Sequence, residues 1–445
     1  MSTEASANAE VRRSFAWRTL AAVAGMVSSF LLTVVVVRSL DDRDAATFFA
    51  ILAALAVGPL FGRFGLGLNV VRLMPAEPDA QVRRRIAATH LQATVVLSCL
   101  SAPVIALIAC NGLFGHPEFV WVFVLTTALI VVESTRLMLS DIFAAAGRIA
   151  ASSATMHYIR SLLVLPCVAF VIFVLHRLSL LAVLETYLGV AVVQLVVALI
   201  YARKEVALFH LPAGISTLRT AIGQGAQIFS LDFSTFMMMQ GTIWLATAAF
   251  SPLHATQYSA AATLAMQVTV LESLSALAVA PAAARLWAAG NKDGLVRTLS
   301  NAATLNAFVV IGIVGMLALF GPTVLELFYG TSIRPAGTLL LILATSGIFQ
   351  ALFNVSITML EITGQIRAAA GTALAVLVVV LPCAVAAAWL GGPIALAVVS
   401  SVGVSAMYTC QWLTARRLFD AVPRAHSHLF RAAREILRDA EPTTA

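Results

Sequence analysis

Two stretches of the chain that lie far apart are similar in sequence: RLMPAEPDAQVRR at residues 72–84 and RLWAAGNKDGLVRT at residues 285–298. Two further pairs of similar stretches are DAATFFA at 44–50 with HATQYSA at 254–260, and GRIAA at 147–151 with GQIRAA at 364–369. The separation within the pairs increases slowly and steadily from the first pair along the chain to the last. Unrelated matches would not fall in this order, so we predict that the chain consists of two equivalent halves.

Composition places both halves in a membrane. Hydrophobic residues make up 60% of the 445 residues and charged residues only 11%, against about 25% in soluble domains. Apolar stretches of about 20 residues, long enough to cross a bilayer as a helix, recur from end to end. The net charge of +7 is typical of cytoplasmic loops of a membrane protein, so no nucleic-acid partner is expected. The five cysteines form no CxxC pair, and we predict no disulfide, metal or cofactor site.

We predict an all-α, polytopic membrane protein with 12 transmembrane helices in two pseudo-symmetric six-helix bundles, as in transporters built from parallel repeats. The expected spans are 15–37, 46–68, 88–110, 119–141, 153–175, 179–201, 224–250, 256–280, 303–325, 336–360, 368–390 and 394–414. The expected domains are an N-terminal lobe at 1–203, a cytoplasmic linker at 204–222, a C-terminal lobe at 223–418 and a basic cytoplasmic tail at 419–445.

The distribution of Lys and Arg predicts the orientation, because cytoplasmic loops of membrane proteins carry more of these residues. With both termini in the cytoplasm, most of the 28 Lys and Arg, including the run of three arginines at 83–85, lie on the cytoplasmic side. Only Arg38, Arg43, Arg177 and Arg334 face the other side, and Arg63, Arg136 and Arg160 lie within spans. The opposite orientation would reverse this bias.

Ionisable side chains interrupt the apolar spans, where each is costly unless it meets water, protein or an opposite charge. They are Arg63, Glu133, Arg136, Asp141, Arg160, Asp232 and Glu272. Asp141 reaches the cytoplasmic interface and is interpreted as an interfacial residue. Glu133 and Arg136 are three residues apart on one helix face, so we expect them to pair. Two interpretations of the pair are open: it fixes its helix to a neighbour, or it lines a polar cavity between the halves.

The buried charges do not recur in the other half, although the loop motifs do, and this asymmetry favours a functional role. Guanidinium groups match phosphate oxygens with paired donors, so we predict that Arg63, Arg136 and Arg160 bind a phosphate-bearing group. The polar residues expected to meet the hydroxyl groups of a substrate are Asn69, Gln224, Gln227, Gln240 and Asn354. The candidates for coupling to a proton or Na⁺ are Asp232, Glu272 and Glu133.

Segments of both halves resemble a known family. RSLDDRDAATFFAILAALAVGPLFGRFGLGLNVVRLMP at 38–75 and FSLDFSTFMMMQGTIWLATAAFSPLHATQYSAAATL at 229–264 are similar to polysaccharide and O-antigen flippases of the multidrug/oligosaccharidyl-lipid/polysaccharide (MOP) exporter superfamily. The resemblance covers nearly the whole chain through loose patterns of Gly, Pro and apolar residues. The chain departs from the family pattern at Arg63, where relatives often carry an acidic residue, and at Phe233, where an arginine commonly follows the aspartate.

The resemblance implies a flippase of the bacterial inner membrane. Such a protein moves a polyprenyl-pyrophosphate-linked glycan from the cytoplasmic to the outer leaflet by alternating access, for exopolysaccharide, capsule or O-antigen biosynthesis. The phosphate-bearing group expected at the three arginines would then be this pyrophosphate, and the five polar residues would bind its sugar hydroxyls. Its partners would be that glycan lipid, membrane lipids, a proton or Na⁺, and a glycan polymerase.

Two alternatives to the flippase remain open. One is a cation-coupled multidrug antiporter of the same superfamily, which would need acidic residues in its cavity. The less favoured one is a membrane O-antigen polymerase or ligase, which would carry a large outer loop. The chain shows neither such a loop nor a nucleotide-binding motif, so we do not expect an enzyme and assign no catalytic residue.

Overall fold

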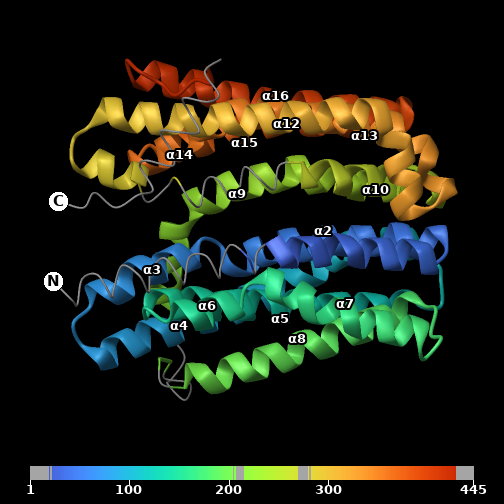
Figure 1. Ribbon diagram of the computed structural model, residues 1–445. Helices are drawn as coiled ribbons and strands as arrows, with labels where there is room; N and C mark the ends of the chain where they lie inside the picture. The colour runs from blue at the N-terminus through green and yellow to red at the C-terminus, as the bar shows by residue number, and fades with distance from the viewer. Residues whose placement is uncertain are drawn as a thin grey trace. The chain divides into compact units, whose positions relative to one another are not determined.

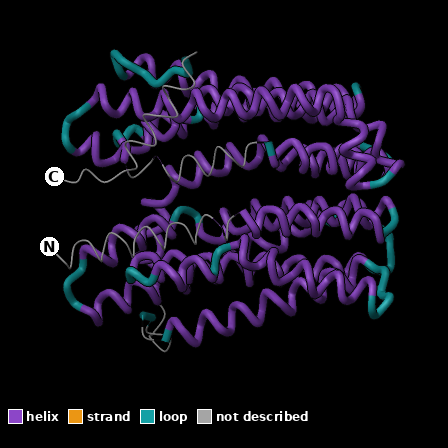
Figure 2. Tube along the Cα trace, viewed as in Figure 1, coloured by secondary structure: helices purple, strands orange, loops and turns teal. Residues whose placement is uncertain are grey.

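The fold is known from a computed structural model of the chain. The structure describes residue 20 and residues 23–203, 205–206, 215–268, 279 and 282–426, apart from the side chains of residues 149, 157–158, 215–221, 224 and 227–228. Throughout this part of the chain the regular elements are helices, without any strand (Figure 2). The chain divides into two compact units, Met1–Phe229 and Ser230–Ala445. The predicted all-α fold in two halves is therefore confirmed.

In the described part of the chain, short loops connect successive helices of both units (Figure 1). The N-terminal unit contains an apolar helix at Val23–Ser39, then α2 (Asp42–Arg63), α3 (Leu66–Ala76), α4 (Ala80–Ala109), α5 (Phe119–Ala145), α6 (Ile149–Ala154), α7 (His157–Phe173) and α8 (Leu180–Ala202). Helix α9 (Ile215–Ala249) contains the point of division. The C-terminal unit continues with α10 (Pro252–Gln267), α12 (Lys292–Tyr329), α13 (Gly337–Phe353), α14 (Val355–Ile362), α15 (Ile366–Leu390) and α16 (Gly392–Leu418). The predicted lobe, linker and tail boundaries stay predictions.

The helix boundaries follow the internal repeat. Helix α2 begins at Asp42 and α10 at Pro252, each two positions before its copy of the first pair of similar stretches. Helix α6 begins at Ile149 and α15 at Ile366, each two positions after the start of its copy of the last pair. The glycine that opens each copy of this last pair has a positive φ. Corresponding helices therefore begin at the same separation along the chain as the similar stretches. This agreement indicates that the two halves are built from the same succession of helices.

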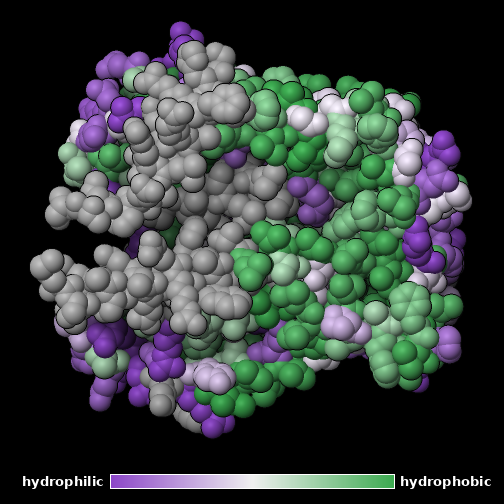
Figure 3. Space-filling view, viewed as in Figure 1, coloured by the Kyte–Doolittle hydropathy of each residue, from purple (hydrophilic) through white to green (hydrophobic). Residues whose placement is uncertain are grey.

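The chain is a multi-pass membrane protein. In the described residues, nine helices are long and apolar enough to cross a membrane. Their outer faces expose large hydrophobic side chains, such as Leu390 at 88%, Leu319 at 76% and Val193 at 64% exposure. In the view of Figure 3, hydrophobic residues cover the flank of each unit and hydrophilic residues gather at the helix ends. The predicted spans at 15–37 and 256–280 run partly over residues outside the described part of the chain.

Each unit has its own hydrophobic core. In the N-terminal unit, buried residues of α3, α4, α5 and α8 pack together, among them Leu66, Met138 and Phe143. In the C-terminal unit, a core formed largely by α15 and α16 includes Leu377 and Met407. The core of the N-terminal unit includes residues of α5, the helix that carries Glu133, Arg136 and Asp141.

Helices α2 and α3 form one interrupted span. Phe64 and Gly65 lie between them, and both have a positive φ, of 42° and 74°. A β-carbon on Gly65 would collide with the carbonyl oxygen of Gly225 in α9, so only glycine fits this position. The Phe64 ring stacks on Phe229 with the ring centroids 4.1 Å apart. The first part of α9 therefore packs against the break in the N-terminal unit.

Candidate functional site

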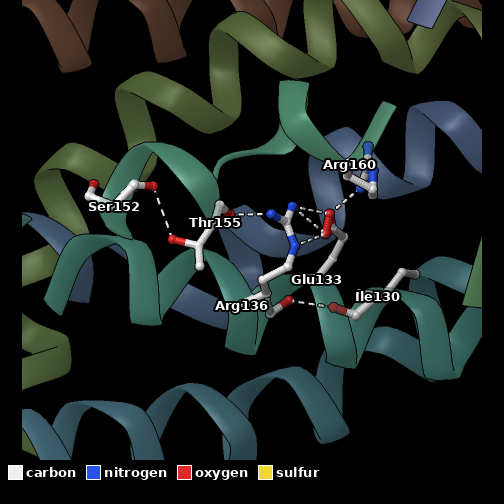
Figure 4. A network of polar contacts seen from close by, with 7 residues as sticks. Ile130, Glu133, Arg136, Ser152, Thr155 and Arg160 are labelled. Carbon is white, nitrogen blue, oxygen red and sulfur yellow. Dashed lines mark hydrogen bonds and ion pairs between the residues drawn. The ribbon is translucent and has the colours of Figure 1, made fainter. Parts of the chain in front are cut away.

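A cluster of three charged residues lies inside the N-terminal unit. The side chains of Glu133 and Arg136 in α5 have no exposed surface, and Arg160 in α7 is 8% exposed. The Glu133 carboxylate lies between the two guanidinium groups (Figure 4). Nε and Nη2 of Arg136 donate to Oε2 of Glu133 at 3.0 and 2.7 Å, and Nη1 of Arg160 donates to Oε1. One carboxylate thus serves two arginines, and these three residues together carry one excess positive charge.

Arg136 also stabilises the break between α6 and α7. Helix α6 ends at Ala154 and α7 begins at His157, so the last carbonyl groups of α6 lack partners within a helix. Nη1 of Arg136 donates to the carbonyl oxygen of Thr155, and a cation at the C-terminal end of a helix is favourable. The predicted Glu133–Arg136 pair is confirmed, and its surroundings favour the interpretation in which it joins α5 to a neighbouring helix.

Arg160 has fewer partners than Arg136. Its guanidinium carbon lies 5.0 Å from the ring centre of Tyr187 in α8, within the range of a cation–π interaction. Its Nε is buried and has no hydrogen-bond partner in the described part of the chain. Tyr187 was not predicted, because an isolated tyrosine in an apolar helix carries no recognisable signal in the sequence.

Arg63 is paired at a second place in the same unit. Its Nη1 donates to Oδ2 of Asp141 at 2.9 Å, and the two side chains are 25% and 23% exposed. A β-carbon on Gly67 would collide with this oxygen, so the close approach of α3 to Asp141 requires a glycine. Asp141 is therefore more than the interfacial residue that the sequence suggested, since it is the partner of Arg63. Arg63, Arg136 and Arg160 together face the two carboxylates of Glu133 and Asp141, so one positive charge remains in excess.

The predicted sugar-binding residues are not brought together within one unit. Asn69 in α3 is buried in the N-terminal unit. Gln240 in α9 is half-buried in the C-terminal unit, where its Nε2 donates to the sulfur of Met266 at 3.3 Å. Asn354 is half-buried between α13 and α14. The side chains of the remaining two, Gln224 and Gln227, lie outside the described residues, so sugar binding by all five stays a prediction.

A small cavity with a mostly apolar lining lies in the C-terminal unit, next to Met266, the partner of Gln240. It measures about 40 Å³ and is lined by residues of α9, α10, α13 and α16, among them the polar residues Thr242, Ser346 and Ser400. Gln350 also lines it, and its Oε1 is buried without a partner in the described part of the chain. The volume is large enough for an ordered water at these polar groups.

Two carboxylates influence each other electrostatically in the C-terminal unit. Asp232 is exposed on α9, and Glu361 is exposed on α14, beyond the candidate span Thr331–Phe353. Partial desolvation of the carboxylate and the charge of Asp232 raise the pKa of Glu361 to about 7. Part of the side chain is nevertheless exposed to solvent. Glu361 was missed because it follows the predicted end of its span. Glu272 lies outside the described residues, and the described groups include no cluster of three potential metal ligands.

Comparisons with known proteins identify the fold. No protein-family model and no curated protein matches the chain. Among solved structures, the lipid II flippase MurJ in an inward closed conformation has a TM-score of 0.69 at 12% identity, covering 96% of this chain and 90% of that one.

Two multidrug transporters are similar as well. An inward-facing multidrug resistance MATE family transporter of the MOP superfamily has a TM-score of 0.66 at 15% identity, over 94% of this chain and 96% of that one. A mutant of the Vibrio cholerae MATE transporter VcmN has a TM-score of 0.62 at 16% identity, over 92% and 97%. The chain therefore has the fold that these transporters and the flippase share.

Proposed function

We propose that the chain is a lipid flippase with this transporter fold. It moves a polyprenyl-pyrophosphate-linked oligosaccharide from the cytoplasmic to the outer leaflet of the bacterial inner membrane, with both termini in the cytoplasm. The glycan then serves exopolysaccharide, capsule or O-antigen biosynthesis, where a glycan polymerase is the expected partner. The similarity of the fold to that of a lipid II flippase supports this proposal.

The observation that carries the proposal is the excess of positive charge in the N-terminal unit. Glu133 faces two guanidinium groups, and Arg160 keeps a buried Nε without a partner in the described residues. An uncompensated charge in an apolar setting is costly, and a phosphate group supplies both the missing negative charge and acceptors for the guanidinium donors. A pyrophosphate headgroup is therefore a suitable substrate group.

The contacts suggest different roles for the three arginines. Arg136 is fully buried and bonded to both Glu133 and Thr155, so its role is to hold the cluster in place. Arg160 and Arg63 retain some exposure and a buried Nε without a described partner, and these two bind the pyrophosphate. Substrate contact by Arg136, which the sequence predicted, is the weaker assignment because no surface of its side chain is exposed.

Coupling to a proton or Na⁺ is assigned to the C-terminal unit. Burial and the charge of Asp232 raise the pKa of Glu361 to about 7, which lets Glu361 exchange a proton near neutral pH. Glu133, also predicted for coupling, is already paired with two arginines, and the positive charge around it makes it a poor cation site. We therefore propose that Asp232, with Glu361 beside it, binds the coupling ion.

A cation-coupled multidrug antiporter is the second candidate function. The Asp232–Glu361 pair favours it, because an acidic pair also suits a cationic drug. The similarity to MATE family transporters fits this candidate equally well. The arginine cluster disfavours it, since an excess positive charge repels a cationic substrate.

Flipping by purified protein in liposomes tests the proposal directly. The substrate is a fluorescent polyprenyl-pyrophosphate oligosaccharide, and the variants are R63Q and R160Q, with R177Q as a matched control on a loop. We expect flipping to fall roughly tenfold or more in R63Q and R160Q, because a lost charge-assisted hydrogen bond typically costs about 1.5–3 kcal/mol. The control should flip normally.

Two outcomes contradict the flippase. If R63Q and R160Q are both folded and flip the substrate at the wild-type rate, the proposed anion site is disproved. Cation-driven uptake of a cationic dye by the wild type, without any flipping, favours the antiporter.

A further inference from the structure

A pocket lies at one end of the N-terminal unit, away from the cluster around Glu133. It has a volume of about 270 Å³, close to the lower end of the range of about 300–1,000 Å³ for small-molecule sites. Its walls come from the end of α3, the start of α4, the end of α5 and the segment after α8, whose ends lie at the same side of the unit (Figure 1). The lining residues are Met74, Pro75, Ala80, Arg83, Arg84, Ala145, Ala146 and Glu205.

The pocket carries an excess of positive charge. Glu205 is paired with Arg148 at 2.8 Å, so its charge is already balanced. Neither Arg83 nor Arg84 has a carboxylate within 4.0 Å among the described residues. These two arginines therefore leave two positive charges without a described counter-charge at the pocket wall.

The two guanidinium groups are held in place by backbone carbonyl groups. Nη1 of Arg83 donates to the carbonyl oxygens of Glu77 and Pro78 at 2.9 and 3.1 Å. Nη2 of Arg84 donates to the carbonyl oxygen of Arg203 at 2.9 Å. These contacts use one terminal nitrogen of each arginine, so other donors remain for a ligand. Arginines positioned in this way are suited to an anion with several acceptor oxygens.

The start of α4 is already capped by an acidic side chain. Asp79 is the N-cap of this helix, and its Oδ1 accepts a hydrogen bond from the backbone amide of Gln81 at 2.7 Å. The carboxylate offsets the partial positive charge of the first helical turn. The attraction of the pocket for an anion therefore comes from Arg83 and Arg84.

The surroundings of the pocket are apolar, which indicates where the anion comes from. Val71 and Leu73 on α3 and Val82 on α4 are exposed by 36%, 42% and 36%. Basic residues next to exposed apolar residues are typical of the membrane interface, where an arginine reaches a headgroup while its neighbours contact acyl chains. By the positive-inside rule, this end of the unit faces the cytoplasmic leaflet.

We propose that this pocket binds the phosphate group of an anionic lipid, held by Arg83 and Arg84. A phosphate bound here contacts α4 and the segment after α8, and it reinforces the connections among α3, α4, α5 and α8. The site is separate from the proposed transport function and does not depend on it. A soluble phosphate ion offers the same oxygens, so the test distinguishes the two sources.

Purified full-length protein in detergent supplies the test. Its thermal unfolding midpoint is measured with added phosphatidylglycerol, with the uncharged-headgroup lipid phosphatidylcholine, and with inorganic phosphate. The variants are R84Q and R83Q/R84Q. The matched control is R85Q, because Arg85 is exposed on the same helix turn and loses the same charge without lining the pocket.

We expect phosphatidylglycerol to stabilise the wild type and R85Q more than phosphatidylcholine does. In R84Q the apparent lipid affinity should fall roughly tenfold or more, and in R83Q/R84Q the difference between the two lipids should vanish. Each variant is compared with itself in the two lipids, so a general loss of stability does not mimic the result.

The three probes separate the outcomes. A response to phosphatidylglycerol alone supports the lipid headgroup. An equal response to inorganic phosphate that R84Q abolishes supports the phosphate site but overturns the lipid assignment. An unchanged lipid response in R83Q/R84Q, or an equal loss in R85Q, overturns the site.

Discussion

The two units share one succession of helices but differ at the position of the charged cluster. With α6 aligned on α15, the residues that correspond to Glu133, Arg136 and Arg160 are Gln350, Phe353 and Leu377. Phe353 packs near Trp412 with the ring centroids 5.4 Å apart, and Leu377 is 5% exposed in a hydrophobic core. The corresponding helices therefore pack with uncharged side chains, one polar and two apolar, in one unit and with an ion cluster in the other. Because the C-terminal unit forms these helices without the charges, function is the better explanation for them.

Removing the shared carboxylate should have the largest effect. In E133Q, Arg136 and Arg160 lose their counter-charge inside the unit, and breaking a buried ion pair in this way costs about 3–5 kcal/mol of unfolding free energy. The C-terminal unit provides the control E326Q, because the Glu326–Arg334 pair is 32% and 60% exposed and such pairs contribute about 0–1 kcal/mol. Thermal unfolding in detergent compares the two, and equal losses would contradict the buried cluster.

The break between α2 and α3 should give the next largest effect. In G65A, a β-carbon meets the Gly225 carbonyl oxygen at a positive φ, so we expect a loss of about 2–4 kcal/mol from strain and overpacking. Gly371 in α15 of the other unit has open space around it, and G371A should gain about 0.5–1 kcal/mol. Unfolding midpoints of the two variants check this, and a G65A protein as stable as the wild type would disprove the close contact.

Transferring the uncharged set to the N-terminal unit should change stability less. The triple variant E133Q/R136F/R160L reproduces the residues of the C-terminal unit and removes all three charges together, so none is left without a partner. Replacing a buried ion network by apolar residues is often neutral or stabilising, and two of these three replacements are apolar. We expect the free energy of unfolding of the triple variant to lie within about 2 kcal/mol of the wild-type value and to exceed that of E133Q. Flipping should be lost because Arg160 is absent. A triple variant less stable than E133Q would show that the cluster is a folding requirement.

The smallest effect concerns the acidic pair of the C-terminal unit. Because the pKa of Glu361 is raised from 4.5 to about 7, the folded state holds this proton more tightly than the unfolded chain. Its contribution is fully present below pH 4.5 and is lost as the pH rises through 7. The wild type should therefore lose stability relative to E361Q over this window. Unfolding midpoints across the window measure the difference.

Asp232 should set part of that pH window. In D232N the charge that raises the pKa of Glu361 is gone, so the loss of stability should occur at lower pH. If the difference in unfolding midpoint between E361Q and the wild type did not depend on pH, the electrostatic coupling between the two carboxylates would be disproved.

The sequence by itself determined the class of fold, the membrane spans and the division into two halves. These follow from local composition and from a repeat whose separations reappear in the helix starts of α2 and α10 and of α6 and α15. The Glu133–Arg136 pair was predictable as well, because residues three apart on a helix are neighbours.

Only the tertiary structure decided what the charges contact. Asp141 lies 78 residues from Arg63, and Glu133 lies 27 from Arg160, so their pairing depends on how separate helices pack. The pocket at Arg83 and Arg84 likewise needs helix ends from four parts of the chain. Hydrophobicity acts locally and can be read along one helix, whereas the partner of a buried charge is set by the neighbouring helices.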